Sequence, residues 1–372
     1  MLHYCNKNRI LLFFIKESVK STIIVSNSYI VNVLTTKGKT MLNNLKTTTA
    51  LVGALSIAAT AAVAETKVTG NIEQTFATVS QDLAANEVNG KRGFGTESNI
   101  GLKASKDLDN GMTAKYGFTL EADSTAKSDT KYLTLGSGNF STTIGEDTGH
   151  NLNSSIIPFV SDNFETIGGS TGGGGLNFDS HGSSLNPHES AHISFDFKFD
   201  GGKATYRYAP NNTNKAGDST ISDGSSQTEY LISGKFNGIG YVAGKMIGEE
   251  ANSDDAGDEG DYRVLGLTYT YNNITFGVEE RDTDTGSTAA GSEKDARQYG
   301  IAAAINDNTS IGVYMLKNEK DATSTEEEAK MIQLGYNLGG LGVQVSYMQI
   351  EDANYTAGAD ADVVQIKTTQ KF

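Results

Sequence analysis

The feature that most constrains this chain is a strict, repeated alternation of apolar and polar residues. It is clearest in four segments, 112–120, 193–199, 332–338 and 341–347. In 193–199, for example, isoleucine and phenylalanine alternate with serine, aspartate and lysine. Because successive side chains of a β-strand point to opposite faces, a period of two residues predicts strands with one apolar and one polar face.

Two kinds of connection separate such segments, and they alternate along the chain. Seven are short and rich in Gly, Asn and Asp, residues that tolerate the positive φ of tight hairpin turns. They lie at 109–111, 136–139, 200–202, 237–238, 272–273, 307–308 and 339–340. Eight are longer and polar, near 80–92, 122–129, 147–190, 210–226, 248–260, 282–293, 318–328 and 351–360. Together these connections join 16 strands and place every short turn on the same side.

The predicted fold class is therefore all-β, a 16-stranded antiparallel transmembrane β-barrel formed by residues 65–372. An even strand count with short turns at one end and long loops at the other is the plan of such barrels. A soluble secreted β-sandwich or repeat protein would also give alternating strands, but it would not place all the short turns on one side. The polar faces also carry charges deep within strands, among them Lys198, Arg207, Lys235 and Glu279.

Composition excludes several other classes of protein. The 372 residues include 30 Lys and Arg against 45 Asp and Glu, a net charge of −15, which excludes a nucleic-acid binder that neutralises phosphates. The mean hydropathy is −0.35, and 65–372 contains no apolar run of about 18 residues, which excludes a helical transporter. With 42 Gly and only 3 Pro, the composition favours strands and turns.

The first 64 residues have the pattern of an export signal. From Met41 a short basic segment precedes the apolar run 50–62, and Ala62-Val63-Ala64 is a small-residue cleavage site. We predict a signal peptide at 41–64 and interpret 1–40 as upstream translated sequence; the alternative is one long, unusual leader. Residues 1–64 hold seven basic residues, one Glu and the single Cys, so 65–372 has 23 basic and 44 acidic residues and a net charge of −21.

Three motifs carry a resemblance to a known family. They are the start Thr66-Lys-Val-Thr-Gly-Asn-Ile72, the hairpin Tyr132-Leu-Thr-Leu-Gly-Ser-Gly-Asn-Phe-Ser-Thr-Thr-Ile-Gly-Glu146, and the final strand ending in Phe372. On these motifs 65–372 resembles the 16-stranded general diffusion porins of Gram-negative outer membranes, in their alphaproteobacterial form. The resemblance implies a homotrimer in the outer membrane, a water-filled lumen, and a third loop folded into the pore. It also implies that the barrel-assembly machinery recognises Phe372, although Gln370 departs from the usual apolar residue at an outward position.

The third long connection, 147–190, is where we expect the constriction. So long an irregular segment is normally functional, and inside a water-filled lumen its backbone stays hydrated. The candidate constriction acids that it carries or adjoins are Glu146, Asp147, Asp162, Glu165 and Asp179. The candidate bases on the pore wall are Lys67, Lys103, Lys115 and Lys131. As in the family that the chain resembles, acid on the loop facing base on the wall would give a transverse field that favours polar solutes.

The predicted function is passive diffusion of small hydrophilic solutes and ions, with cations preferred. Acids in 248–261 and 317–328 support this preference, because an acidic mouth raises the local cation concentration. The competing interpretation is that these acids only keep the surface hydrated. The predicted partners are outer-membrane lipid, the assembly machinery and further copies of the chain, with no cofactor, metal or nucleic acid. Two alternatives stay open: a substrate-specific porin with a binding site in 147–190, and a structural or adhesive surface barrel with a plugged lumen.

One motif points to an enzyme instead. His188-Glu189-Ser190-Ala191-His192 matches the H-E-x-x-H pattern of zinc proteases, which requires a helix to bring both histidines to one side. Pro187 precedes the motif and an alternating strand begins at Ile193, so we expect neither this helix nor an enzyme. The remaining interpretation is adventitious metal binding by His181, His188 and His192.

Overall fold

The computed structural model divides the chain into two units, Met1–Ala62 and Val63–Phe372. In the first unit it describes a pair of antiparallel strands, β1 (His3–Tyr4) and β2 (Leu11–Leu12). In the second it describes residues 65–82, 88–121, 127–146, 152, 154–160, 191–210, 226–249, 260–284, 293–321 and 323–372. The predicted upstream segment 1–40 and signal peptide 41–64 fall outside the described residues, apart from the two short strands.

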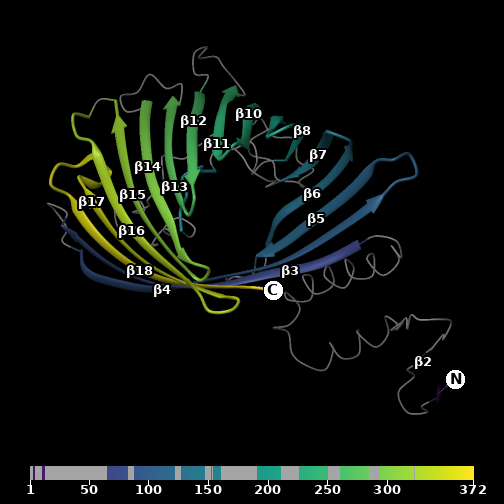
Figure 1. The fold of residues 1–372 in the computed structure, drawn as a ribbon, viewed down its shortest axis with the longest axis horizontal. Helices are drawn as coiled ribbons and strands as arrows, with labels where there is room; N and C mark the ends of the chain where they lie inside the picture. Colours follow the sequence, from purple (N-terminus) through teal and green to yellow (C-terminus); the bar gives the residue numbers. More distant parts are fainter. Residues whose placement is uncertain are drawn as a thin grey trace, which may run out of the picture. The chain divides into compact units, whose positions relative to one another are not determined.

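The second unit is a closed antiparallel barrel, and its described residues form the 16 predicted strands. They are β3 (Glu65–Asp82), β4 (Val88–Asp107), β5 (Thr113–Glu121), β6 (Lys127–Ser137), β7 (Phe140–Glu146), β8 (His192–Phe199), β9 (Gly202–Ala209), β10 (Ser226–Phe236), β11 (Ile239–Glu249), β12 (Gly260–Tyr271), β13 (Ile274–Asp284), β14 (Glu293–Asn306), β15 (Thr309–Lys320), β16 (Glu327–Asn337), β17 (Leu341–Glu351) and β18 (Asp360–Lys371). A short 3-10 helix, η2 (Ala353–Tyr355), precedes β18. Figure 1 shows β18, β3 and β4 running side by side, where the last strand pairs with the first strand of the barrel.

The predicted short turns all join neighbouring strands. In the turn between β10 and β11, Asn237 and Gly238 have φ of 49° and 81°, as the central residues of a type I′ hairpin turn require. The turn between β12 and β13 similarly has Asn272 at φ 53°. Local residue chemistry therefore sets the strand boundaries at this end of the barrel.

The barrel has an apolar outer face and a more polar inner face. On β12, Leu265 is 60% exposed, whereas Val264 beside it is 3% exposed and faces inward. Large apolar side chains recur on the outer face of the other strands, where a bilayer would cover them. Aromatic side chains near the short turns and the C-terminus share this exposure: Phe140, Phe236, Tyr269, Tyr271, Phe276, Tyr336 and Phe372. Within the described residues no helix is long and apolar enough to cross a membrane.

The two ends of the barrel chain close the seam. Gly70 and Phe372 exchange two backbone hydrogen bonds, each with an N–O distance of 2.9 Å. A Cβ at Gly70 would collide with the ring of Phe372, so this glycine makes room for the last side chain. Closure leaves no open sheet edge, which is the condition for a sheet to cross a bilayer.

Candidate functional site

The described residues of the third long connection, 152 and 154–160, lie inside the barrel against the inner wall, as predicted for this loop. Leu152 is fully buried although it belongs to no strand. Its backbone N–H donates to Glu229 Oε2 on β10 over 3.3 Å. Farther round the wall, the N–H of Val160 donates to the Tyr314 hydroxyl on β15 over 2.8 Å. These residues are named the inner segment below; the later part of the connection, 161–190, lies outside the described residues.

A row of strand glycines makes room for the inner segment. A Cβ at Gly266 on β12 would lie 2.5 Å from Ile156 Cγ2, and one at Gly277 on β13 would lie 2.6 Å from Pro158 Cδ. The row continues with Gly300 on β14, opposite Ile157, and Gly335 on β16, opposite Val160. Each position would push the segment away from the wall if it carried a side chain. Glycine within a strand often marks such a close approach of another backbone.

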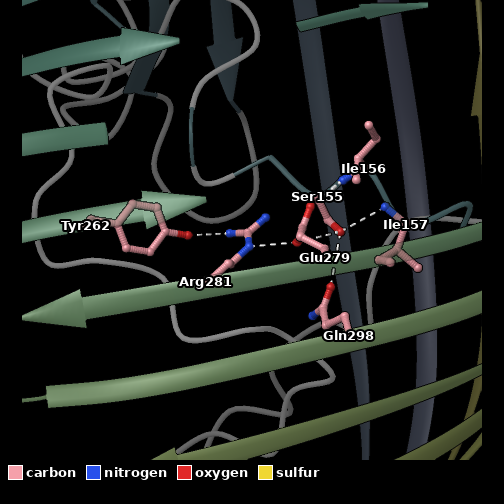
Figure 2. Close-up of polar contacts among 7 residues, drawn as sticks. All are labelled: Ser155, Ile156, Ile157, Tyr262, Glu279, Arg281 and Gln298. Carbon is pink, nitrogen blue, oxygen red and sulfur yellow. Dashed lines mark hydrogen bonds and ion pairs between the residues drawn. The ribbon is translucent and has the colours of Figure 1, made fainter. Parts of the chain in front are cut away.

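Glu279 on β13 is the centre of the polar contacts that hold the inner segment. Its Oε2 accepts from the N–H of Ile156 at 2.8 Å, and its Oε1 lies 3.2 Å from Ser155 Oγ. The Ser155 hydroxyl is also 3.1 Å from Gln298 Oε1 on β14. Figure 2 shows these groups gathered around the carboxylate, with Arg281 on its other side.

Arg281 balances the charge of Glu279 within the wall. Its Nε donates to Glu279 Oε1 over 2.7 Å, and its Nη1 donates to the Tyr262 hydroxyl over 2.6 Å (Figure 2). Both charged side chains are 1% exposed. A buried ion pair is tolerated when further hydrogen bonds satisfy the two ions, and the backbone of the inner segment supplies one of them. The loop and the wall therefore form one hydrogen-bonded unit.

A second buried ion pair fixes the start of the inner segment. Arg207 Nη1 on β9 lies 2.5 Å from Glu229 Oε1 on β10, and both side chains are buried. Glu229 is the residue that accepts the N–H of Leu152. The strand pattern identifies Arg207 and Glu279 only as charges on polar faces, because their pairing needs contacts between strands and a loop far apart in the sequence.

Only one of the predicted constriction acids lies within the described residues. Glu146, the last residue of β7, is buried, and its Oε2 is 3.7 Å from Lys131 Nζ on β6. Lys131 lies two residues from Leu133 on β6, and Glu146 lies two residues from Ile144 on β7. Leu133 and Ile144 are exposed on the outer face, so the strand alternation places Lys131 and Glu146 on that face too. The predictions that Lys131 belongs to the pore wall and that Glu146 is a constriction acid are corrected accordingly. The other predicted acids, Asp147, Asp162, Glu165 and Asp179, lie outside the described residues.

The other three predicted wall bases share the inner face of β3, β4 and β5. Lys67 stands directly opposite Lys103, and Lys115 stands opposite Ser105, two residues along β4. On the same strands Val68, Ile100 and Tyr116 occupy the outer positions and are exposed. Like charges placed directly opposite each other repel, so this cluster is not explained by stability. Among the described residues none of the three lysines has an ion-pair partner.

A second group of inward lysines was not predicted as a site. Lys198 on β8 stands opposite Lys203 on β9, and Lys235 ends the inward row of β10. Lys203 is paired with Asp196 at 3.3 Å. All three lie close to short turns, as do Lys67, Lys103 and Lys115. The strand parity around Lys198 and Lys235 was the available signal, because it places both on polar faces.

The H-E-x-x-H motif ends in a strand where the structure describes it. His192 is the first residue of β8 and is buried, and Ala191 lies in a bend. The helix that a zinc protease needs is thus not present at His192; residues 188–190 lie outside the described part of the chain. The described residues contain no group of three or more His, Cys, Asp or Glu that could hold a metal ion.

Comparison with known families and structures places the chain among outer-membrane channels. It matches the family described as Gram-negative porin over residues 47–372. No curated protein matches it significantly. Among solved structures, the loop L8 deletion mutant of Vibrio cholerae OmpT aligns with a TM-score of 0.61 and 13% identity, covering 83% of this chain and 100% of that one.

Two further structures share this architecture. A mutant of Rhodobacter blastica porin aligns with a TM-score of 0.58 and 13% identity, over 83% of this chain and 100% of that chain. The in-vitro folded OmpT of Vibrio cholerae, described as the trimer form, gives 0.58 and 12% over the same shares. At these identities the likeness concerns the fold.

Proposed function

Because the chain belongs to the Gram-negative porin family and is an outer-membrane channel protein, we propose that it passes small hydrophilic solutes by passive diffusion and prefers cations. The observation that carries the proposal is the inner segment seated inside a closed barrel whose inner face is more polar than its outer face. Such a segment narrows the lumen from one side without crossing lipid. A passive channel of this kind needs no catalytic group and no cofactor.

The position of the lysine cluster supports a transverse field at the constriction. In the closed order of strands, β3, β4 and β5 lie half-way round the barrel from β11, β12 and β13. Lys67, Lys103 and Lys115 therefore face the wall on which the inner segment is seated. We propose that Asp162, Glu165 and Asp179, later in the same connection, supply the opposing negative charge. Polar solutes keep favourable interactions in such a field, whereas apolar ones must displace ordered water.

The proposed cation preference rests on the acid excess. Residues 65–372 have 23 basic and 44 acidic residues, and many of the acids lie in or beside the long connections. An acidic mouth raises the local concentration of cations, whereas the inward lysines near the short turns oppose this effect. Ion selectivity thus depends on the balance between the acids near the long connections and the inward lysines near the short turns.

A reversal potential measures this balance directly. We expect planar bilayers containing refolded 65–372 to show a cation-selective reversal potential in a KCl gradient. Neutralising Asp162 and Glu165 together should move it toward zero, and neutralising the exposed outer-face residue Glu280 should not. Anion selectivity of the unaltered channel would contradict the proposed preference while leaving the channel itself established.

Assembly and export belong to the same proposal. We propose a homotrimer, in line with the trimer form described for Vibrio cholerae OmpT, and export by a cleaved signal peptide at 41–64. The barrel-assembly machinery would recognise the strand that ends in Phe372. Conductance steps in groups of three are expected for the trimer. Bilayers that remain silent would instead favour the structural or adhesive barrel with a plugged lumen.

A further inference from the structure

We propose that a cavity on the short-turn side of the inner segment is a binding subsite for neutral polyhydroxylated solutes, that is, for sugars and other polyols. The inference rests on the proposed function and deepens it, because it assigns a solute class to the same channel. The cavity has a volume of about 490 Å³ and lies on β14–β18, next to Val160 at the end of the described inner segment. We call it the amide pocket; its defining residues are Asn306, Asn308, Ser310, Asn337, Gln344 and Thr369.

Gln344 gives the pocket a buried polar group without a partner. The side chain is 4% exposed, and its Nε2 donates to Ser346 Oγ over 2.6 Å. Its Oε1 has no hydrogen-bond partner. If the amide oxygen and nitrogen exchanged places, an N–H₂ group would be left unpaired instead, so the need for a partner would remain. Buried polar groups in native proteins are nearly always satisfied, by protein, by water or by ligand.

Gln365 repeats this pattern on the neighbouring strand. It stands opposite Ser346, the partner of Gln344, and it is 1% exposed. Neither its Oε1 nor its Nε2 has a hydrogen-bond partner. Gln365 lies outside the lining of the amide pocket, but it shows that the wall beside the pocket carries further buried amide atoms without a partner. Amides both donate and accept, which matches hydroxyl groups, since these do the same.

The charges at the pocket cancel, and this favours a neutral ligand. Lys367 Nζ lies 2.6 Å from Glu73 Oε2, and both side chains are buried. Thr369 Oγ1 also donates to Glu73 Oε1 over 3.3 Å. The remaining charged residues of the lining are Lys371 and Asp307, one of each sign. Together with Glu73 these charges sum to zero, which favours a neutral polyol that binds amides and hydroxyls over an anion or a cation.

Small residues flank Gln344 on the wall of the amide pocket. Gly335 on β16 stands opposite Gln344, and Gly342 precedes it on the same face of β17. Val160 closes the pocket on the loop side, where its N–H is held by Tyr314 and by Gln333 Oε1 at 3.2 Å. A pocket of this volume lies within the range of known small-molecule sites. Its size and polarity suit a monosaccharide or disaccharide.

The test uses refolded 65–372 in planar bilayers, with sucrose as the neutral probe and sodium gluconate as a charged one. We expect sucrose to reduce the single-channel conductance in a saturable way, beyond the effect of bulk viscosity. Gln344→Leu should raise the half-saturating sucrose concentration about tenfold, as for the loss of one hydrogen bond. Gln349→Leu is the matched control, because Gln349 lies on the same strand but on its exposed outer side. This control should leave saturation unchanged.

A second variant guards against misfolding of the first. Ser310→Leu adds apolar bulk on β15 at the pocket wall, away from the buried Gln344 amide, and it should also abolish saturation. Open channels with a linear response to sucrose would overturn the subsite and leave the proposed function standing. Saturation by gluconate but not by sucrose would likewise overturn the assignment to neutral solutes. Silent bilayers would overturn the proposed function itself.

Discussion

At the scale of single residues, the buried charges of the lumen wall bind the inner segment and are not available to a passing solute. Glu279 and Arg281 neutralise each other, and the remaining acceptor capacity of Glu279 goes to the inner segment through Ile156 and Ser155. An ion pair removed from water is costly unless further hydrogen bonds complete it. Here the loop completes it, so the position of the loop and the stability of the pair depend on each other.

This dependence gives a prediction for Glu279→Gln. The substitution leaves Arg281 buried without a counter-charge. Breaking a buried ion pair in this way lowers the free energy of unfolding by about 3 kcal/mol. We expect a lower urea midpoint for unfolding in lipid vesicles and a noisier open channel. Glu280→Gln is the matched control: Glu280 is the next residue, its side chain is 49% exposed, and its partner Arg297 is also exposed. Exposed pairs contribute little, so equal effects of the two variants would contradict this account.

At the scale of elements, the strand glycines determine where the third loop can lie. Gly266, Gly277, Gly300 and Gly335 belong to different strands, yet each faces a different residue of the inner segment. The segment runs across these strands from Ile156 at β12 to Val160 at β16. The glycines therefore form a groove across the wall, and the loop follows it.

A Gly277→Ala substitution tests the groove. The new Cβ would lie 2.6 Å from Pro158 Cδ, so the inner segment must shift away from β13. We expect the barrel to fold and the single-channel conductance to change, because the constriction moves while the strand pairing remains. Gly95→Ala is the control: this glycine faces inward on β4, and its Cβ would lie 3.9 Å from Thr75 Cβ, an ordinary contact. A Gly277→Ala channel with unchanged conductance would show that the segment does not depend on the groove.

At the scale of the whole barrel, charge is distributed unevenly along the pore axis. Near the short turns and the C-terminus, six inward lysines have no ion-pair partner among the described residues: Lys67, Lys103, Lys115, Lys198, Lys235 and Lys371. Toward the long connections the described strands carry facing acids on the outer side of the rim, such as Asp282 opposite Asp295 and Glu328 opposite Glu351. We expect a pore that is basic at one end, with acids around the outer rim of the other, to favour different ions at its two mouths.

This asymmetry predicts current rectification. We expect single oriented channels to conduct differently at positive and negative voltage in dilute KCl. The difference should fade in salt of about 1 M, where the screening length is about 3 Å. Combining Lys198→Gln with Lys235→Gln should weaken the rectification, and Lys330→Gln on the outer face should not. A symmetric current at low salt would contradict the proposed charge distribution.

Most of the barrel plan could be predicted from the sequence, because local chemistry decides it. Period-two patterns such as 341–347 fix the two faces of a strand, and residues such as Asn237-Gly238 fix a turn, whatever the rest of the chain does. Counting alternating connections was then enough for the number of strands. The inward positions of Lys67, Lys103 and Lys115 follow from the same parity.

The seat of the loop and the pairing of charges were decided only by the tertiary structure. Leu152 meets Glu229 and Val160 meets Tyr314 across 77 and 154 residues, and no local pattern encodes such contacts. The sequence alone does not distinguish a glycine that only weakens a strand from one that leaves room for a loop to pack against the strand. Lys131 also follows the outer face, where its partner Glu146 lies. The period-two pattern of the sequence thus determined the strands of the barrel wall. Closure of the sheet brought together the distant residues that bind the loop and pair the charges.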